Sequence, residues 1–251
     1  MGQEQQIKEM VAEHPDYKLA EYCEYWEDKT GVRLSESAMC RFLQKQQLTV
    51  KKTIRSSQAD KESTKKQRIE YWEKIKNVAP KNLVFLDEMG VLLGIMRGRS
   101  RSMKGERAYD IKPFYRGSRV TVVGAISKKK VIAMKTMGKS INGENFLKFV
   151  QEELAPKLWK GAVVVMDNLR VHKVKGVEEM IEAVGARVVY LSPYSPEFNS
   201  LEHLWWELKA LLRRFIPKSM QIVEKLLELG VKFCSSKQIR NYFAHCCYCT
   251  F

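Results

Sequence analysis

Residues 163–168 read Val-Val-Val-Met-Asp-Asn and residues 83–87 read Leu-Val-Phe-Leu-Asp, so two short apolar runs each lead into an aspartate. Apolar runs of this length are typical of buried strands. Active sites of α/β sheets usually lie where the strands end, at the carboxyl edge of the sheet. The two runs therefore predict that Asp87 and Asp167 emerge together at that edge.

Strands and helices alternate around these two runs. The β-branched runs 119–126 and 130–135, joined by Ser-Lys-Lys, are typical of a hairpin. The remaining pattern predicts a fifth strand over 187–190 and helices over 143–156, 174–184 and 199–214. A hairpin followed by alternating strands and helices predicts an α/β fold built on one mixed five-stranded sheet flanked by helices.

Three short helices are expected before this domain, over residues 3–13, 17–29 and 36–47. A link containing Gly31 precedes the third helix, and this is the outline of a small all-α helix-turn-helix DNA reader. In such a unit the last helix enters the major groove, where polar side chains meet bases or phosphates, here Ser37, Arg41, Gln44 and Lys45. An ordinary three-helix packing unit is the alternative. We expect this segment to cover residues 1–48.

Residues 49–80 are expected to form a basic linker and a lead-in helix over about 63–76. Low hydrophobicity with dense lysine and arginine is typical of a linker, and a basic linker can lie along a phosphate backbone. The residues expected to do so are Lys51, Lys52 and Arg55. The α/β domain is expected over residues 81–245, followed by a tail at 246–251.

The chain has 44 lysines and arginines against 29 aspartates and glutamates, a formal net charge of +15. The excess is concentrated in residues 41–81, with 12 basic and 4 acidic residues, and in residues 97–139, with 13 and 2. Two such blocks favour a nucleic acid as the partner over a merely solvated surface. The second block is expected to form a DNA-facing loop containing Arg97, Arg99, Arg101, Lys104, Arg107, Arg116 and Arg119.

Composition disfavours several other classes of protein. Hydrophobic residues make up 45% of the chain, which excludes wholesale disorder. No run approaches 18 apolar residues, so no membrane span is expected, and the polar N-terminus shows no signal peptide. A zinc site of His245, Cys246 and Cys249 is an alternative for the cysteine-rich end, but no second ligand pair has usable spacing, and reduced cysteines are the simpler interpretation.

Three acids carry the expected chemistry. Glu202 lies in the first turn of the helix expected over 199–214, which can bring it beside Asp87 and Asp167. Carboxylates that meet at one point repel unless a cation joins them, and oxygen ligands select Mg²⁺ or Mn²⁺. Two such ions can activate a water and stabilise the leaving oxygen of a phosphodiester displacement. Each acid also has an ordinary alternative, because either aspartate could close a turn and Glu202 could interact with the helix dipole.

Three motifs resemble the DDE transposases of the mariner superfamily, in their bacterial insertion-sequence branch. They are FLDE at 85–88, VVMDN at 164–168 followed by His172, and SPYSPEFNSLEHLWWELK at 192–209. The 34 residues between Asp167 and Glu202 (positions 168–201) match the spacing of that branch, and INGENF at 141–146 resembles its entry into a helix. The resemblance covers roughly residues 3–245.

The resemblance implies a ribonuclease H-like fold in which Asp87, Asp167 and Glu202 bind divalent metal, two Mg²⁺ or Mn²⁺ ions per active site. It implies an enzyme that cuts double-stranded DNA at the inverted repeats of a mobile element and joins the freed 3′-hydroxyl to target DNA. It also implies a homodimer on DNA, in the bacterial cytoplasm with the nucleoid and without a membrane partner.

Neighbouring residues acquire supporting roles. Asn168 and His172 follow the second aspartate and could orient metal ligands or contact phosphate, although His172 could equally be structural. Asn199 could hold the loop that positions Glu202. Nearby are two further acids that the family pattern does not make ligands, Glu88 and Glu197, and two tryptophans that could stack on bases or pack in the core, Trp205 and Trp206.

Relatives usually carry two helix-turn-helix units before the catalytic domain, and this sequence is expected to carry only the second. Two alternatives to an active transposase stay open. One is a truncated or decayed element protein that binds DNA without catalysing transposition. The other is a structure-selective nuclease on the same fold, which would cut DNA without joining it.

Overall fold

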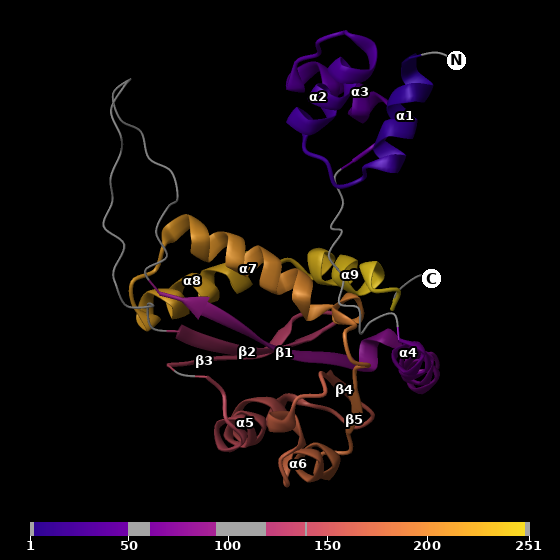
Figure 1. Cartoon of the computed structure of the whole chain (residues 1–251). Helices are drawn as coiled ribbons and strands as arrows, with labels where there is room; N and C mark the ends of the chain where they lie inside the picture. Colours follow the sequence, from indigo (N-terminus) through magenta and orange to yellow (C-terminus); the bar gives the residue numbers. More distant parts are fainter. Residues whose placement is uncertain (1–2, 50–60, 94–118, 139, 249–251) are drawn as a thin grey trace. The chain divides into compact units, whose positions relative to one another are not determined.

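The computed structural model describes residues 3–49, 61–93, 119–138 and 140–248 of the chain (Figure 1). The chain divides into two compact units, Met1–Arg55 and Ser56–Phe251, each with a core of its own. Within the described residues, no helix is both long and apolar enough to cross a membrane.

The described residues of the first unit form three helices, α1 (Gln3–Glu13), α2 (Leu19–Thr30) and α3 (Glu36–Lys45). They pack around Ile7, Met10, Tyr22, Trp26 and Met39, all of which are buried. Gly31 ends α2 with a φ of 72°, a left-handed conformation that glycine adopts without strain. Ser35 then caps α3, because its hydroxyl accepts a hydrogen bond from the backbone N–H of Ala38 at 3.2 Å.

The second unit is built on one five-stranded sheet. Its strands are β1 (Leu83–Leu92), β2 (Arg119–Ser127), β3 (Val131–Met137), β4 (Val163–Met166) and β5 (Arg187–Tyr190), in the order β3-β2-β1-β4-β5. β2 is antiparallel to both of its neighbours, whereas β4 is parallel to β1 and β5. The predicted mixed five-stranded sheet is confirmed.

Helices cover both faces of this sheet (Figure 1). One face carries α7 (Leu201–Phe215), α8 (Met220–Phe233) and α9 (Ser236–His245), and the other carries α5 (Gly143–Phe149) and α6 (Val177–Ala183). Helix α4 (Glu62–Ile75) packs against β5 at the edge of the sheet. Short 3-10 turns lie at Pro80–Asn82, Arg170–Lys173 and Pro196–Phe198.

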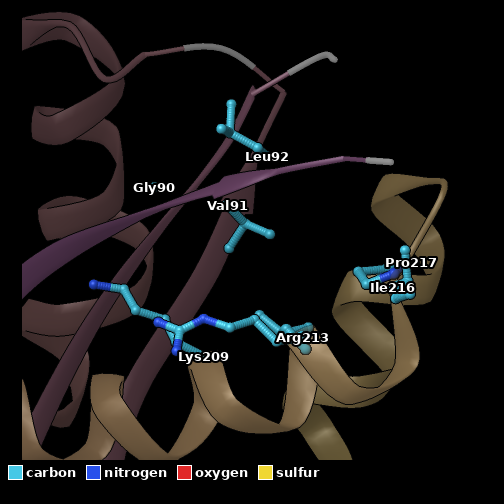
Figure 2. A pocket seen from close by; sticks show the side chains of 8 residues that line it. Gly90, Val91, Leu92, Lys209, Arg213, Ile216 and Pro217 are labelled. Carbon is cyan, nitrogen blue, oxygen red and sulfur yellow. The ribbon is translucent and has the colours of Figure 1, made fainter. Parts of the chain in front are cut away.

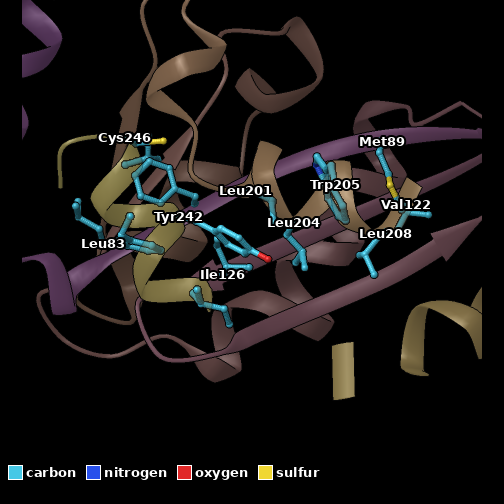
Figure 3. Packing of buried hydrophobic residues seen from close by; sticks show 14 of the residues in the cluster. Leu83, Met89, Val122, Ile126, Leu201, Leu204, Trp205, Leu208, Tyr242 and Cys246 are labelled. Carbon is cyan, nitrogen blue, oxygen red and sulfur yellow. The ribbon is translucent and has the colours of Figure 1, made fainter. Parts of the chain in front are cut away.

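Alternate residues of the strands serve two separate cores. On β1, Phe85, Met89 and Val91 face the α7 side, and Val84 and Leu86 face the α5 side. Figure 3 shows the core on the α7 side, where leucines of α7 and Trp205 lie against residues of β1 and β2. Because successive side chains of a strand point to opposite faces, this division also assigns a face to each acid of β1.

The structure corrects two sequence predictions and adds two helices to the predicted elements. Asp87 does not end its strand, because β2 pairs with β1 as far as Leu92 and extends the strand beyond its partner β4. The helix expected over 143–156 is α-helical only to Phe149 and continues as a π-helical turn, Val150–Leu154, and a 3-10 turn, Ala155–Lys157. Helices α8 and α9 were not predicted.

The C-terminal residues also differ from the expected tail. Cys246 and Tyr248 are buried and belong to the core on the α7 side. Their contacts are with residues distant in sequence, since the hydroxyl of Tyr248 bonds to the hydroxyl of Tyr71 and donates to the carbonyl of Phe198. The described end of the chain is therefore part of the sheet domain.

Candidate active site

Asp87 lies on β1, and Asp167 directly follows the neighbouring strand β4. Phe85 is the partner of Val165 in the parallel pair of β1 and β4, so the residues two positions further on are Asp87 and Asp167. Phe85 and Val165 both face α7, and side chains two positions apart on a strand share a face. Asp87, two positions after Phe85 on β1, therefore points to the α7 side of the sheet, and Asp167 is the first residue beyond the end of β4.

Close packing of α7 on the sheet brings Glu202 toward the same place. Gly124 of β2 is the register partner of Asp87, and a Cβ atom at Gly124 would lie only 2.6 Å from Cη2 of Trp205. Only a glycine leaves room for this indole, which is buried with 1% of its surface exposed. Trp205 lies three residues after Glu202, so its packing site fixes the first turn of α7 beside Asp87.

Burial and neighbouring acids raise the pKa of Asp87. Asp87 is 9% exposed, and its pKa is raised to about 8, first by burial and then by the negative charge of Glu202. The charges of Glu88 and Asp167 raise the pKa of Asp87 further, whereas a backbone hydrogen bond from Glu88 opposes the shift. Glu202 and Asp167 therefore both lie within electrostatic reach of Asp87.

The chemistry of this donor set suits a divalent cation. The predicted ligands are carboxylates, the groups that Mg²⁺ and Mn²⁺ prefer, and a bound cation would offset the repulsion that raises the pKa of Asp87. The carboxylates are not already gathered around one point, because no three acid, histidine or cysteine side chains within the described ranges form a metal-binding group. The arrangement thus fits a metal ion in its charge and in its ligand type. The carboxylates would have to move closer together to bind one.

His172 connects Asp167 to Glu88, an acid of β1. Its ring is fully buried, with Nδ1 2.7 Å from Oδ1 of Asp167 and Nε2 2.6 Å from Oε1 of Glu88. Burial alone would lower the pKa of His172, but the hydrogen bonds to Asp167 and Glu88 outweigh it and raise the pKa to about 10. The imidazole is therefore positively charged at neutral pH and joins the two carboxylates.

The contacts of Asp167 leave one of its oxygens open. Oδ1 accepts a hydrogen bond from the backbone N–H of Leu169, at 3.1 Å, and is ion-paired with Nδ1 of His172, which also hydrogen-bonds with the backbone carbonyl of Asp167 at 3.1 Å. Among the described residues Oδ2 has no hydrogen-bond partner. The carboxylate is thus held by one oxygen while the other remains able to bind a ligand.

The loop before α7 is held by Arg68 of α4. The Arg68 guanidinium donates to Oγ of Ser195 at 3.0 Å, to the carbonyl of Tyr194 at 3.0 Å and to Oε1 of Glu197 at 2.6 Å. It also lies over the ring of Phe198, 5.7 Å from the centroid. One side chain therefore fixes the shape of the segment from which Glu202 emerges.

Asn199 links this loop to the start of α7. Its side-chain Oδ1 accepts from the N–H of Leu201 at 3.1 Å, and its carbonyl accepts from the N–H of Glu202 at 3.1 Å. Asn199 is 3% exposed, so these bonds are shielded from water. The contacts are those expected of a residue that holds the helix start, where backbone N–H groups lack partners within the helix.

Other predicted site residues are more scattered. Asn168 is exposed immediately after Asp167, and Ser37, Arg41 and Lys45 are exposed on α3. Several predicted DNA-contacting residues lie outside the described residues, namely Lys51, Lys52, Arg55, Arg97, Arg99, Arg101, Lys104 and Arg107. The zinc alternative gains no support: Cys246 is buried in the core, Cys249 is outside the described residues, and the described part of the chain holds no metal-binding group.

Sequence reasoning did not assign roles to two residues of this site. Glu88 was noted only as an extra acid, although it directly follows Asp87 and therefore points to the opposite face, toward His172. No sequence pattern indicates a role for Arg68, because its hydrogen-bond partners lie more than 120 residues away in the chain. Only the paired acids of FLDE could have drawn attention to Glu88 in advance.

Comparisons with known proteins agree with this architecture. A family model described as DDE superfamily endonuclease matches residues 82–222. The strand transfer complex of Mos1 superposes with a TM-score of 0.62 at 16% identity, covering 97% of this chain and 74% of the other. The Mos1 mariner paired-end complex with Mg gives 0.61 at 15% identity, with 99% and 77% covered. A search of curated proteins finds no match.

The catalytic domain of the Mos1 mariner transposase matches the sheet domain separately. Its TM-score is 0.55 at 14% identity, and the match covers 78% of this chain and 91% of the other. At such low identity the likeness shows the fold, and the fold is ribonuclease H-like, as the sequence resemblance implied.

Proposed function

The chain belongs to the DDE superfamily of endonucleases, and from that premise we propose that it is a metal-dependent DNA transposase. In this proposal it cuts the ends of a mobile element of the bacterial insertion-sequence branch and joins the freed 3′-hydroxyl to target DNA. The observation that carries the proposal is Asp87, whose pKa is raised first by burial and then by the charges of neighbouring acids, Glu202 and Asp167 among them. An isolated structural aspartate would not need to be buried near two other acids.

The three acids have the leading role in the proposed reaction. Asp87, Asp167 and Glu202 would hold two Mg²⁺ or Mn²⁺ ions, and the neighbours solved with Mg and with Mn, both of Mos1, support this choice of metals. When bound, two such ions supply an activated water and a stabilised leaving oxygen for displacement at phosphorus. The open Oδ2 of Asp167 supports its role as a ligand.

Other residues of the chain would position these acids. His172, held by Glu88, keeps the Asp167 carboxylate in one orientation, and a partner of this kind typically tunes metal affinity. Asn199 and Arg68 keep the start of α7, and hence Glu202, in place. None of them needs to contact the reacting phosphodiester.

The proposed partner is double-stranded DNA, both the inverted repeats of the element and the target. Ser37, Arg41 and Lys45 of α3 would read the element end as part of a helix-turn-helix, and the two basic blocks would contact phosphates. One solved neighbour is a Mos1 transposase paired-end complex with a transposon end, which supports a DNA partner. We also propose that the protein acts on DNA as a homodimer. We propose that the protein acts at the bacterial nucleoid.

Amide variants of the three acids test this function. We expect Asp87→Asn, Asp167→Asn and Glu202→Gln each to abolish cleavage of DNA that carries the flanking ends of the gene, in Mg²⁺ or Mn²⁺, while binding of that DNA persists. Glu182→Gln, at an exposed acid of α6, is the matched control and should cut like the wild type. Cleavage retained by an amide variant would contradict the assignment, and binding without cutting by the wild type would favour an inactive element protein.

A further inference from the structure

One face of α7 carries a tryptophan and two basic residues in line with Glu202. Positions 202, 206, 209 and 213 are four, three and four residues apart, which places them in one stripe along a helix. The stripe consists of Glu202, Trp206, Lys209 and Arg213. It extends about 16 Å along the helix axis, close to five phosphate spacings of a stacked DNA strand at about 3.4 Å each.

The tryptophan of this stripe does not belong to the core. Trp206 is 71% exposed, whereas its neighbour Trp205 is 1% exposed and packs on the sheet. The apolar side of α7 is supplied instead by Leu204, Leu208 and Leu212, which are all buried. A large, flat aromatic surface therefore faces solvent one helical turn after the proposed catalytic glutamate.

The two basic residues line a shallow hollow of about 180 Å³ between the end of β1 and α7. Figure 2 shows Lys209 and Arg213 extended along this hollow, below Val91 of β1. Within the described residues neither of them is ion-paired with a carboxylate. The other acid of α7, Glu207, lies about 140° around the helix from Glu202, so the two cations are not neutralised along the stripe.

We propose that Trp206, Lys209 and Arg213 form a binding track for a single DNA strand leading away from the catalytic carboxylates. One base stacks on the exposed indole, and the phosphates beside it contact the lysine and the arginine. Stacking on an aromatic surface accepts any base, and basic side chains follow the backbone, so the track binds without sequence preference. The proposal relies on the proposed function only for the position of the reacting phosphodiester near Glu202.

The charge pattern favours nucleic acid over a protein partner at this face. An apolar docking site would be expected to surround its aromatic residue with further exposed apolar side chains, whereas Trp206 is followed along the stripe by two cations. A planar indole with cations at one-turn intervals matches the alternation of bases and phosphates in a strand.

Binding of a short single-stranded oligonucleotide to the full chain tests the track. In EDTA, fluorescence anisotropy should show about tenfold weaker binding by Trp206→Ala, with partial recovery in Trp206→Phe. Lys209→Gln and Arg213→Gln should each lower the slope of log K against log salt by about 0.7. The matched controls are Phe233→Ala, an aromatic side chain 79% exposed on α8, and Lys225→Gln on the same helix, and both should bind like the wild type.

Photocrosslinking localises the contact, because we propose that other basic segments of the chain also bind DNA. A strand containing iodouracil should crosslink to the wild type at Trp206, as identified by mass spectrometry of the peptide. Crosslinks only elsewhere, together with unchanged affinity and salt slope in the three variants, would overturn the track.

The two proposals fail in different ways. If the wild type cuts DNA and the track variants bind and cut as it does, the track is wrong and the transposase function stands. If the strand crosslinks at Trp206 and the wild type never cuts any DNA, the track stands and the function fails.

Discussion

Nδ1 of His172 lies 2.7 Å from Oδ1 of Asp167, at the point where β4 ends. The other ring nitrogen is held by Glu88, so the imidazole joins the carboxylate at the end of β4 to an acid of β1. Charge-assisted hydrogen bonds of this kind are short and directional, and they fix the orientation of the groups that they join. The carboxylate that we propose as a metal ligand is thus oriented before any metal binds.

Removing His172 should weaken metal binding. We expect His172→Ala to lower the affinity for Mn²⁺ by about 10- to 100-fold, because Asp167 loses its oriented partner. The variant should also be less stable by about 3 kcal/mol, since Glu88 loses its buried partner. Calorimetric titration with Mn²⁺ and urea unfolding measure the two effects, with Glu88→Gln as the milder change. Unchanged Mn²⁺ affinity in His172→Ala would show that the contact does not serve the metal.

Asp87 should destabilise the metal-free protein at high pH. Its pKa in the folded state is raised to about 8 from 3.8, so the folded state binds a proton more tightly than the unfolded state. Stability is therefore unaffected below about pH 4 and falls as the pH rises from about 4 to about 8. In EDTA at pH 9, Asp87→Asn should unfold at a higher temperature than the wild type, and the difference should vanish near pH 4.

Comparing the unfolding temperatures of the wild type and Asp87→Asn also tests whether the site binds metal. Mg²⁺ should raise the unfolding temperature of the wild type and have little effect on Asp87→Asn, because the variant lacks one proposed ligand. A wild type that is more stable than Asp87→Asn in EDTA at pH 9 would contradict the electrostatic description of this site.

Arg68 should affect the position of Glu202 through the loop before α7. Arg68→Ala removes three hydrogen bonds to the loop, so we expect faster hydrogen exchange in residues 192–200 and cleavage reduced by about tenfold or more. Lys66→Ala, at an exposed position of the same helix, is the matched control and should change neither. Exchange unaltered by Arg68→Ala would mean that the loop holds its shape without α4.

Two hydrogen-bonded tyrosines, Tyr71 on α4 and Tyr248 near the C-terminus, should differ in importance for stability. Tyr248 donates to the carbonyl of Phe198 at 2.7 Å and accepts from Tyr71, so Tyr71→Phe removes one hydrogen bond and Tyr248→Phe removes two. Urea unfolding should show that the free energy of unfolding falls by about 1 kcal/mol in Tyr71→Phe and by about 2 kcal/mol in Tyr248→Phe. Tyr194→Phe, at a side chain 54% exposed, should be neutral. Equal stability of Tyr248→Phe and the wild type would contradict the packing of the C-terminal residues.

Elements that depend on local pattern could be predicted from sequence. The strand Val163–Met166 is a β-branched run buried on both faces, and its bounds were predicted without error. The extension of β1 past Asp87 depends on pairing with β2, a strand more than 25 residues away in the chain, and an apolar run alone does not report it. The face to which Glu88 points was therefore not predictable until the strand was known to continue through it.

The parts of the candidate site that could not be predicted also depend on contacts between residues far apart in sequence. Asp87, Asp167 and Glu202 could be proposed from strand ends, helix position and spacing, but the contacts of Arg68 with the 192–199 loop join residues that no local pattern relates. The burial of Cys246 and Tyr248 likewise depends on Tyr71 and Phe198, which lie far from the C-terminus in sequence. Composition had suggested only a tail.

The most direct test of the proposed function is a joining assay with the flanking ends of the gene, a target plasmid and Mg²⁺ or Mn²⁺. We predict covalent joining of the 3′-ends of the element to the target by the wild type, lost in EDTA and in Asp167→Asn and retained in Glu182→Gln. Cleavage without joining would indicate a nuclease rather than a transposase. Joining that persists in EDTA or in Asp167→Asn would contradict the proposed metal chemistry of the three acids.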